Sequence, residues 1–163
     1  VWRAMPPAAR RLLLAEVFMR WCDWLVRDFV VLYLVGVRGL TLEQAGLLLG
    51  LQNLVALVGY LPVGRLTVRV GSYPFIGVSF VFSALFPLAL AAVPTAWVAA
   101  AFVASGLREV GEPARKALLT DLLPDESRAR GIGLYWGVRT FAVSWSALAG
   151  AVLWAAGGSA ALL

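Results

Sequence analysis

The chain has 163 residues, of which 61% are hydrophobic and only 14% are charged, against about 25% in an ordinary soluble domain. This composition excludes a soluble globule, which needs a polar surface, and also a disordered chain or a disulfide-stapled secreted module. We therefore expect an integral membrane protein in contact with the lipid bilayer. The net charge is +5 at pH 7, but the basic residues lie between long apolar runs and form no basic stripe, so we expect no nucleic-acid partner.

The first predicted helix covers residues 11–37 and carries a stripe of charges. Four residues of alternating sign follow one another at spacings of three or four: Glu16, Arg20, Asp23 and Arg27. This spacing places them on one helical face, each beside a partner of opposite sign. In lipid such a face must turn toward other helices or toward water. Two interpretations stay open: a polar cavity for a solute or coupling ion, and an internal salt-bridge ladder that orients the helices.

The second predicted helix covers residues 41–66 and begins at a capping box, in which Thr41 and Gln44 satisfy backbone N–H groups of the first turn. Asn53 lies in the middle of this helix, where it either faces a cavity or forms a hydrogen bond to another helix. Two glycine pairs have the four-residue spacing of close helix packing and are expected at helix contacts: Gly46 with Gly50, and Gly133 with Gly137.

No charged residue lies within residues 72–107. One helix of that length would be far longer than the hydrocarbon core, which is about 30 Å thick. We therefore expect two helices, over residues 73–93 and 95–120, with the break at Pro94, because proline cannot continue the first of them.

The fourth predicted helix carries charges in its last third. Arg108, Glu109 and Glu112 precede Pro113, which permits a bend. Glu109 has no residue of opposite charge four positions away on either side. This makes it the candidate for a protonatable coupling group.

The fifth predicted helix covers residues 130–156 and contains Arg139 in an otherwise apolar stretch. An isolated intramembrane arginine needs an acid from another helix, and Asp23 and Glu109 are the candidates. Residues 157–163 are expected to be the start of a truncated sixth helix.

Basic residues are divided unevenly between the two sides of the predicted five-helix bundle, residues 11–156. Nine fall in the N-terminal segment and around the connections after the second and fourth helices, whereas Arg38 alone falls on the other side. The positive-inside rule makes residues 1–10 a cytoplasmic linker or tail. The preference for Arg over Lys is typical of a GC-rich genome, and we expect a multi-pass protein of a bacterial cell membrane, inner or plasma.

The chain has no His, and Cys22 is its single cysteine. An imidazole metal site, a Ser-His triad and an internal disulfide are therefore excluded. We predict that the protein is not an enzyme and has no catalytic residue, no metal site and no cofactor.

Two stretches resemble motifs of the major facilitator superfamily of transporters. The first, residues 59–71, contains the pattern G-R-L-x-x-R-x-G in a short connection, where Gly64, Arg69 and Gly71 match that family's loop motif. The second, residues 108–118 with the segment after it, resembles the end of a fourth helix and the cytoplasmic loop that follows. The resemblance covers nearly the whole chain.

This resemblance implies an all-α integral membrane protein: five transmembrane helices of one six-helix half, with the sixth helix missing and the N-terminus cytoplasmic. The loop motif is degraded, because Val68 stands where the family's acid is expected, and this favours the C-terminal half. A fragment of a longer transporter is favoured over a natural half-size protein. The implied partners are the other half, in the same chain or as a dimer mate, a small-molecule solute, and protons.

The resemblance also suggests roles for residues. The first and fifth helices of a half line the solute cavity, and with two further polar positions the candidates for solute binding or coupling are Arg20, Asp23, Arg27, Asn53, Glu109 and Arg139. Charges of the loop motif latch the closed cytoplasmic side, and the candidates there are Gly64, Arg65, Arg69, Gly71, Arg115, Lys116 and Arg128. Simple inside-positive loop charges explain the basic members of this second group equally well.

The predicted function is therefore part of a secondary active transporter that moves a small solute by alternating access, as a uniporter, symporter or antiporter, including proton-coupled efflux of drugs or metabolites. Mixed charges in the first helix suit a polar or zwitterionic solute. The alternative is a stand-alone polytopic membrane scaffold without transport activity, in which the charge pairs serve stability alone.

Overall fold

A computed structural model describes the backbone of residues 5–162 and the side chains of residues 5–158. This part of the chain folds into helices and two short 3-10 turns, and it contains no strand. The elements are α1 (Pro7–Arg27), α2 (Val30–Gly36), α3 (Leu42–Val70), α4 (Tyr73–Ala92), η2 (Thr95–Trp97), α5 (Val98–Arg108), α6 (Gly111–Leu122), η3 (Asp125–Ser127) and α7 (Arg128–Leu162).

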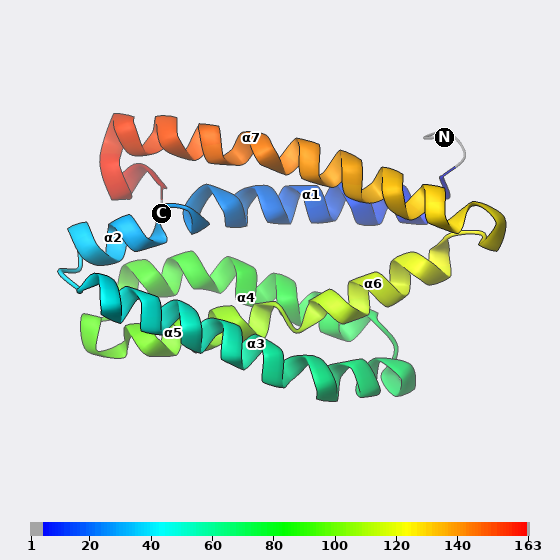
Figure 1. Cartoon of the computed structure of the whole chain (residues 1–163), viewed down its shortest axis with the longest axis horizontal. Coiled ribbons are helices and arrows are strands. Elements are labelled where there is room, and N and C mark those ends of the chain that lie inside the picture. The colour runs from blue at the N-terminus through cyan, green and yellow to red at the C-terminus, as the bar shows by residue number, and fades with distance from the viewer. Residues whose placement is uncertain (1–4, 163) are drawn as a thin grey trace.

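The helices run along one common axis and form an antiparallel bundle (Figure 1). α1 packs along α7, α3 packs along α5, and α4 packs on both α5 and α6. The start of α1, the α3–α4 connection and the α6–α7 connection lie at one end of the bundle, and the α2–α3 and α4–α5 connections lie at the other (Figure 1).

α3 begins at a capping box, as the sequence predicts. The Oγ1 atom of Thr41 accepts a hydrogen bond from the backbone N–H of Gln44 at 3.2 Å, and the side chain of Gln44 accepts one from the backbone N–H of Thr41 at 2.9 Å. Two N–H groups that the first turn leaves without partners are thereby satisfied.

The other end of α3 lies further along the chain than predicted. The helix continues through Arg65 and Arg69 to Val70, and Gly71 ends it with a φ of +90°, a backbone conformation that glycine adopts without strain. The connection to α4 is correspondingly short. Arg65 and Arg69 therefore lie on the last turns of a helix and not in a loop.

Two segments predicted as single helices are each interrupted. The first predicted helix forms α1 and α2, with a turn at Asp28 and Phe29 between them. The fourth forms η2, α5 and α6, with a turn at Glu109 and Val110. Pro113 explains the second interruption, because it has no N–H for the carbonyl of Glu109 and its ring crowds that carbonyl.

Three helices in the described part of the chain are long and apolar enough to cross a membrane: Leu42–Val70, Tyr73–Ala92 and Asp125–Gly158. The α1–α2 and α5–α6 segments are not among them, since each is interrupted and α1 is also charged. The count of five transmembrane helices over residues 11–156 stays a prediction.

The two ends of the chain differ in detail from the predicted boundaries. α1 begins at Pro7, inside the predicted tail of residues 1–10, of which residues 1–4 lie outside the described part. α7 is interrupted at Gly158, whose φ of +62° and ψ of −149° turn the chain away from the helix axis (Figure 1). A sixth helix beginning at residues 157–163 stays a prediction, and residue 163 lies outside the described part.

Several glycines allow close contacts between helices, and Gly106 and Gly150 are two that lie against the backbone of a facing helix. A Cβ atom on Gly106 of α5 would lie 2.7 Å from the carbonyl oxygen of Gln52 on α3, and one on Gly150 of α7 would lie 2.8 Å from the carbonyl oxygen of Leu25 on α1. The glycine pairs singled out from their spacing do not act this way, and that prediction is wrong. Nothing among the described residues lies within 4 Å of a Cβ placed at any of them: Gly46, Gly50, Gly133 and Gly137.

Candidate functional site

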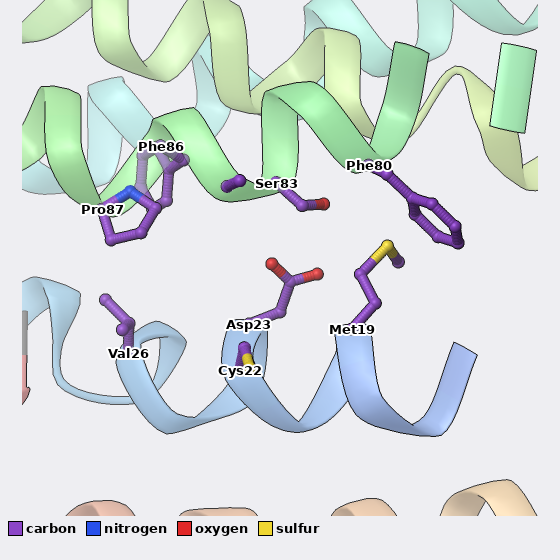
Figure 2. A pocket seen from close by; sticks show the side chains of 9 residues that line it. Met19, Cys22, Asp23, Val26, Phe80, Ser83, Phe86 and Pro87 are labelled. Atoms are coloured by element: carbon purple, nitrogen blue, oxygen red, sulfur yellow. The ribbon is translucent and has the colours of Figure 1, made fainter. Parts of the chain in front are cut away.

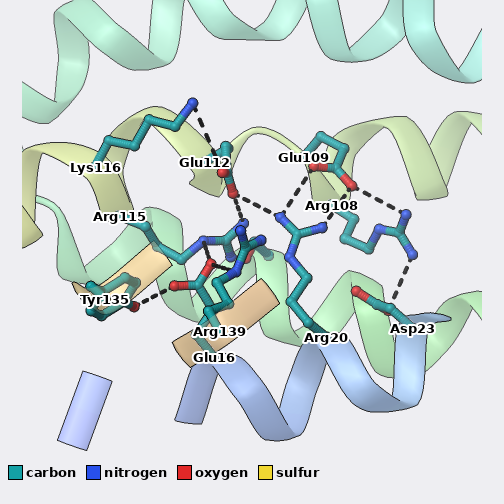
Figure 3. A network of polar contacts seen from close by, with 11 residues as sticks. Glu16, Arg20, Asp23, Arg108, Glu109, Glu112, Arg115, Lys116, Tyr135 and Arg139 are labelled. Carbon is teal, nitrogen blue, oxygen red and sulfur yellow. Dashed lines mark hydrogen bonds and ion pairs between the residues drawn. The ribbon is translucent and has the colours of Figure 1, made fainter. Parts of the chain in front are cut away.

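Charged side chains of α1 are buried against the interruption between α5 and α6 (Figure 3). Glu16, Arg20 and Asp23 are only 3%, 5% and 8% exposed. Their partners come from other helices, so the expected pairing along α1 is wrong. The reason lies in the packing of the helices. The charged side chains of α1 point toward charged side chains of facing helices in a buried space, and they pair with those instead of with their neighbours on α1.

Arg20 and Arg108 share one glutamate at this interruption. Arg20 donates to Glu112 at 2.7 Å, and its two terminal nitrogens lie 3.4 and 3.5 Å from the oxygens of Glu109. Arg108 donates to Asp23 at 3.1 Å and to Glu109 at 3.2 Å. Glu109, which has no residue of opposite charge four positions away in the sequence, therefore has two guanidinium partners, one from α1 and one adjacent in sequence.

Arg115, grouped by sequence with the cytoplasmic loop motif, lies inside the bundle. Its side chain is 3% exposed. Its Nη2 atom donates to Glu112 at 2.7 Å, its Nη1 atom donates to Ser79 of α4 at 2.7 Å, and its Nε atom lies 3.8 Å from Glu16. Arg115 thus connects α6 with α1 and α4.

Arg139 of α7 is paired with an acid on α1, but the acid is Glu16. The Nε atom of Arg139 lies 3.0 Å from Glu16, whose other oxygen accepts a hydrogen bond from Tyr135. The expectation that Asp23 or Glu109 pairs with Arg139 is wrong, because α7 packs along α1 at the level of Glu16 and those two acids pair with Arg108.

These contacts form one row of eight side chains in which the sign alternates at every step, here called the charge row: Asp23, Arg108, Glu109, Arg20, Glu112, Arg115, Glu16 and Arg139. Four carboxylates balance four guanidinium groups, and no side chain of the row is more than 18% exposed. Lys116, whose side chain is 60% exposed, approaches the row only at Glu112, at 3.9 Å. A buried row without net charge suits a membrane interior, where an uncompensated charge is costly.

Asp23 ends the charge row at a cavity of about 290 Å³ between α1 and α4. Figure 2 shows its carboxylate and the hydroxyl of Ser83 facing this space from the two helices, between apolar side chains such as Met19 and Phe80. Neither Oδ2 of Asp23 nor Oγ of Ser83 has a hydrogen-bond partner among the described residues. The carboxylate of Asp23 therefore has one guanidinium partner, and its second oxygen has no hydrogen-bond partner among the described residues.

A second cavity, of about 340 Å³, lies at the turn between α1 and α2 and is here called the polar cavity. Its polar lining residues are Arg27, Asp28, Gln52, Asn53, Ser105 and Arg108. Arg27, Asp28 and Asn53 are exposed, whereas Ser105 and Arg108 are buried. Asp28 and Ser105 are not among the residues predicted from the sequence to bind the solute. The sequence signal for Asp28 is a charge within a predicted membrane helix, but nothing in the sequence marks Ser105.

The six predicted solute and coupling residues thus divide between two regions. Arg27 and Asn53 line the polar cavity, and the guanidinium group of Arg27 lies 5.1 Å from the ring centre of Trp24. The other four belong to the charge row: Arg20, Asp23, Glu109 and Arg139.

Most of the predicted loop-motif residues lie near helix ends. Gly64, Arg65 and Arg69 lie in the last two turns of α3, and Arg128 begins α7, where it pairs with an acid three residues before it. Lys116 lies on α6, with its ammonium 5.8 Å from the ring centre of Trp136. Within the described part of the chain, no three His, Cys, Asp or Glu side chains gather in a way that could hold a metal ion.

Long apolar helices around buried, paired charges define a multi-pass membrane protein, and a polar cavity beside an interrupted helix is typical of transporters. The sequence model of the Major Facilitator Superfamily matches residues 12–162. The chain therefore belongs to the major facilitator superfamily, a family of membrane transporters of small solutes. No curated protein and no solved structure matches the chain.

Proposed function

We propose that this chain supplies one half of a secondary active transporter, and that a small polar solute binds in the polar cavity while the protein alternates between two access states. The observation that carries the proposal is the position of this cavity, beside the α1–α2 turn and between α1, α3 and α5. Irregular backbone is tolerated at membrane depth where it lines a water-filled cavity or is buried in protein. An interrupted helix at a polar cavity therefore has a functional explanation.

A second half, in the same polypeptide or as a dimer mate, completes the cavity in this proposal. Arg27, Asp28 and Asn53 are exposed in this chain by itself. Charged side chains within a membrane face a bundle interior or a water-filled cavity, seldom lipid. The open side of the polar cavity is accordingly the side where the facing half would lie.

The N-terminus faces the cytoplasm in this proposal. The starts of α1 and α7 and the end of α3 lie at one end of the bundle (Figure 1), and these segments carry Arg10, Arg11, Arg65, Arg69 and Arg128. The α2–α3 connection at the other end carries Arg38 alone. This asymmetry supports a cytoplasmic N-terminal end by the positive-inside rule, and in this proposal Arg65, Arg69 and Arg128 act in a cytoplasmic latch.

Proton coupling, if the transporter uses it, has two candidate carboxylates. Glu109 has two guanidinium partners, whereas Asp23 has one and directs an oxygen into the α1–α4 cavity. A proton therefore reaches Asp23 with fewer contacts broken. We expect Asp23→Asn to abolish solute accumulation driven by a proton gradient and to spare solute exchange; the same pattern in Glu109→Gln alone would assign the role to Glu109.

Counterflow in proteoliposomes tests the transport function. Proteoliposomes that contain the complete polypeptide are loaded with an unlabelled solute, and the same solute is added outside in radiolabelled form. Leucine, glucose and ethidium represent zwitterionic, uncharged and cationic solutes. Transient accumulation of at least one label supports the proposal. A correctly folded protein that accumulates none of the three contradicts it.

The scaffold alternative has one observation in its favour, the pairing of the charge row from end to end. A purely structural network predicts that neutralising a pair, as in Asp23→Asn with Arg108→Gln, changes the melting temperature and nothing else. Loss of counterflow in that double variant at an unchanged melting temperature would argue against a scaffold.

A further inference from the structure

We infer that the polar cavity selects a compact zwitterion, whose carboxylate is bound by Ser105 and Arg108 of α5 and whose ammonium group is bound by Asp28 at the end of α1. This inference rests on the function proposed above and adds the chemical class of its solute. The cavity volume of about 340 Å³ is at the small end of the range for small-molecule sites, about 300–1,000 Å³, so the solute is small.

The carboxylate end of the site is defined by two buried donors. Ser105 is fully buried and Arg108 is 4% exposed, and they lie three residues apart on α5, hence on one face of that helix. Within the described part of the chain, neither the hydroxyl of Ser105 nor the Nε–H of Arg108 has a hydrogen-bond partner. Buried donors without acceptors are destabilising, and the two oxygens of a carboxylate satisfy both at once.

The ammonium end is defined by an acid at a helix terminus. Asp28 lines the cavity, is exposed, and is the residue that caps the C-terminus of α1. The last carbonyl groups of a helix carry partial negative charge, which favours a cation at this place in addition to the carboxylate itself. The side-chain amide of Asn53, on the facing helix α3, offers one more acceptor to the same cavity.

Charge balance favours a solute that carries both a carboxylate and an ammonium group over a solute that carries only one of them. The charge row is neutral, and the polar cavity adds one positive side chain, Arg27, and one negative side chain, Asp28. A solute with net charge would leave that charge uncompensated at membrane depth, whereas a zwitterion leaves the total unchanged. An uncharged polyol is also neutral, but it matches neither the donors at one end nor the acid at the other.

A matched series of ligands tests this inference by titration calorimetry on the complete protein in lipid nanodiscs. Leucine carries both groups, 4-methylpentanoate lacks the ammonium group, leucinamide lacks the carboxylate, and xylitol is uncharged. We expect leucine to bind about tenfold more tightly than either single-charge analogue, since a hydrogen-bonded charge contributes about that factor. We expect xylitol not to compete.

Two substitutions in the site should act on opposite ends of the ligand. Asp28→Asn should weaken leucine and leucinamide about tenfold and leave 4-methylpentanoate unchanged. Ser105→Ala should weaken leucine and 4-methylpentanoate and leave leucinamide unchanged. A general loss of folding cannot produce this crossed pattern. Ser83→Ala, which removes another buried serine with an unpaired hydroxyl, and Glu43→Gln, which removes an exposed acid of α3, are the matched controls and should bind leucine as the unsubstituted protein does.

The outcomes separate this inference from the function on which it rests. The expected order of affinities with the crossed pattern supports the inference. Equal binding of leucine and xylitol, preference for a single-charge analogue, or no binding of any ligand by a protein that shows counterflow of glucose or ethidium overturns the zwitterion and leaves the transporter. A protein that binds no ligand and shows no counterflow overturns both.

Discussion

The charge row and the polar cavity lie next to each other in the bundle and share Arg108, but they use charge differently. In the row each carboxylate or guanidinium group has an oppositely charged neighbour, and the side chains are almost inaccessible to water. In the cavity Arg27 and Asp28 are exposed, and Ser105 is buried with an unpaired hydroxyl. Each charge of the row is paired with another charge of the row, whereas Arg27 and Asp28 are exposed in the polar cavity. The row therefore holds helices together, and the exposed charges of the cavity are the ones available to the solute proposed above.

Removing one member of the row should give the largest loss of stability. Glu112→Ala leaves Arg20 and Arg115 without the carboxylate that each contacts at 2.7 Å, and breaking a buried pair costs about 3–5 kcal/mol. Unfolding by denaturant in detergent micelles measures this loss. Lys116→Ala, one turn away with a side chain 60% exposed, is the control and should change stability by less than about 0.5 kcal/mol. Equal losses in the two variants would mean that the row does not stabilise the bundle.

Adding a methyl group at the close contact between α5 and α3 should have an intermediate effect on stability. This contact positions Arg108 and Ser105 for both regions. In Gly106→Ala the new methyl group would lie 2.7 Å from the carbonyl oxygen of Gln52, and overpacking of this kind costs about 1–3 kcal/mol. Gly46→Ala adds the same group to α3 in open space and should stabilise the helix by about 0.5–1 kcal/mol. Thermal unfolding should therefore show shifts of opposite sign, and shifts of the same sign would contradict the packing.

A substitution in the polar cavity should have the smallest effect on stability. Arg27→Gln removes an exposed charge, so the free energy of unfolding should change by less than about 0.5 kcal/mol. Solute counterflow should nevertheless fall about tenfold, since a charged side chain that lines the proposed solute cavity is lost. Arg11→Gln removes an exposed charge at the start of the same helix and should leave both measurements unchanged. A stability loss as large as that of Glu112→Ala would place Arg27 with the structural charges.

Local chemistry made part of this fold predictable. The capping box at Thr41, the break at Pro94 and the family resemblance each depend on residues close together in the sequence, and the structure and the family match agree with them. The interruption at Glu109 was predictable only as a permitted bend, because Pro113 weakens a helix at that point without deciding whether packing will straighten it.

Partners across helices could not be predicted in the same way. Spacing shows that Glu16 and Arg20 share a face, but the partner of each depends on how far α1 is rotated and shifted against α6 and α7. Arg139 pairs with Glu16 for that reason, and the unpaired hydroxyl of Ser105 has no counterpart in any sequence pattern. Glycine spacing failed similarly at Gly46, since four-residue spacing describes a helix face without saying what faces it.

The alternating order of the charge row has an electrical consequence. A transmembrane voltage does work of about 2.3 kcal/mol on each elementary charge for every 100 mV it crosses, but only on net charge that moves. Four carboxylates and four guanidinium groups that shift together along the membrane normal carry no current. A conformational change that translates the row as a unit without turning it is therefore insensitive to membrane potential. Charge displacement recorded during such a movement would report the solute, its coupling ions and the side chains outside the row.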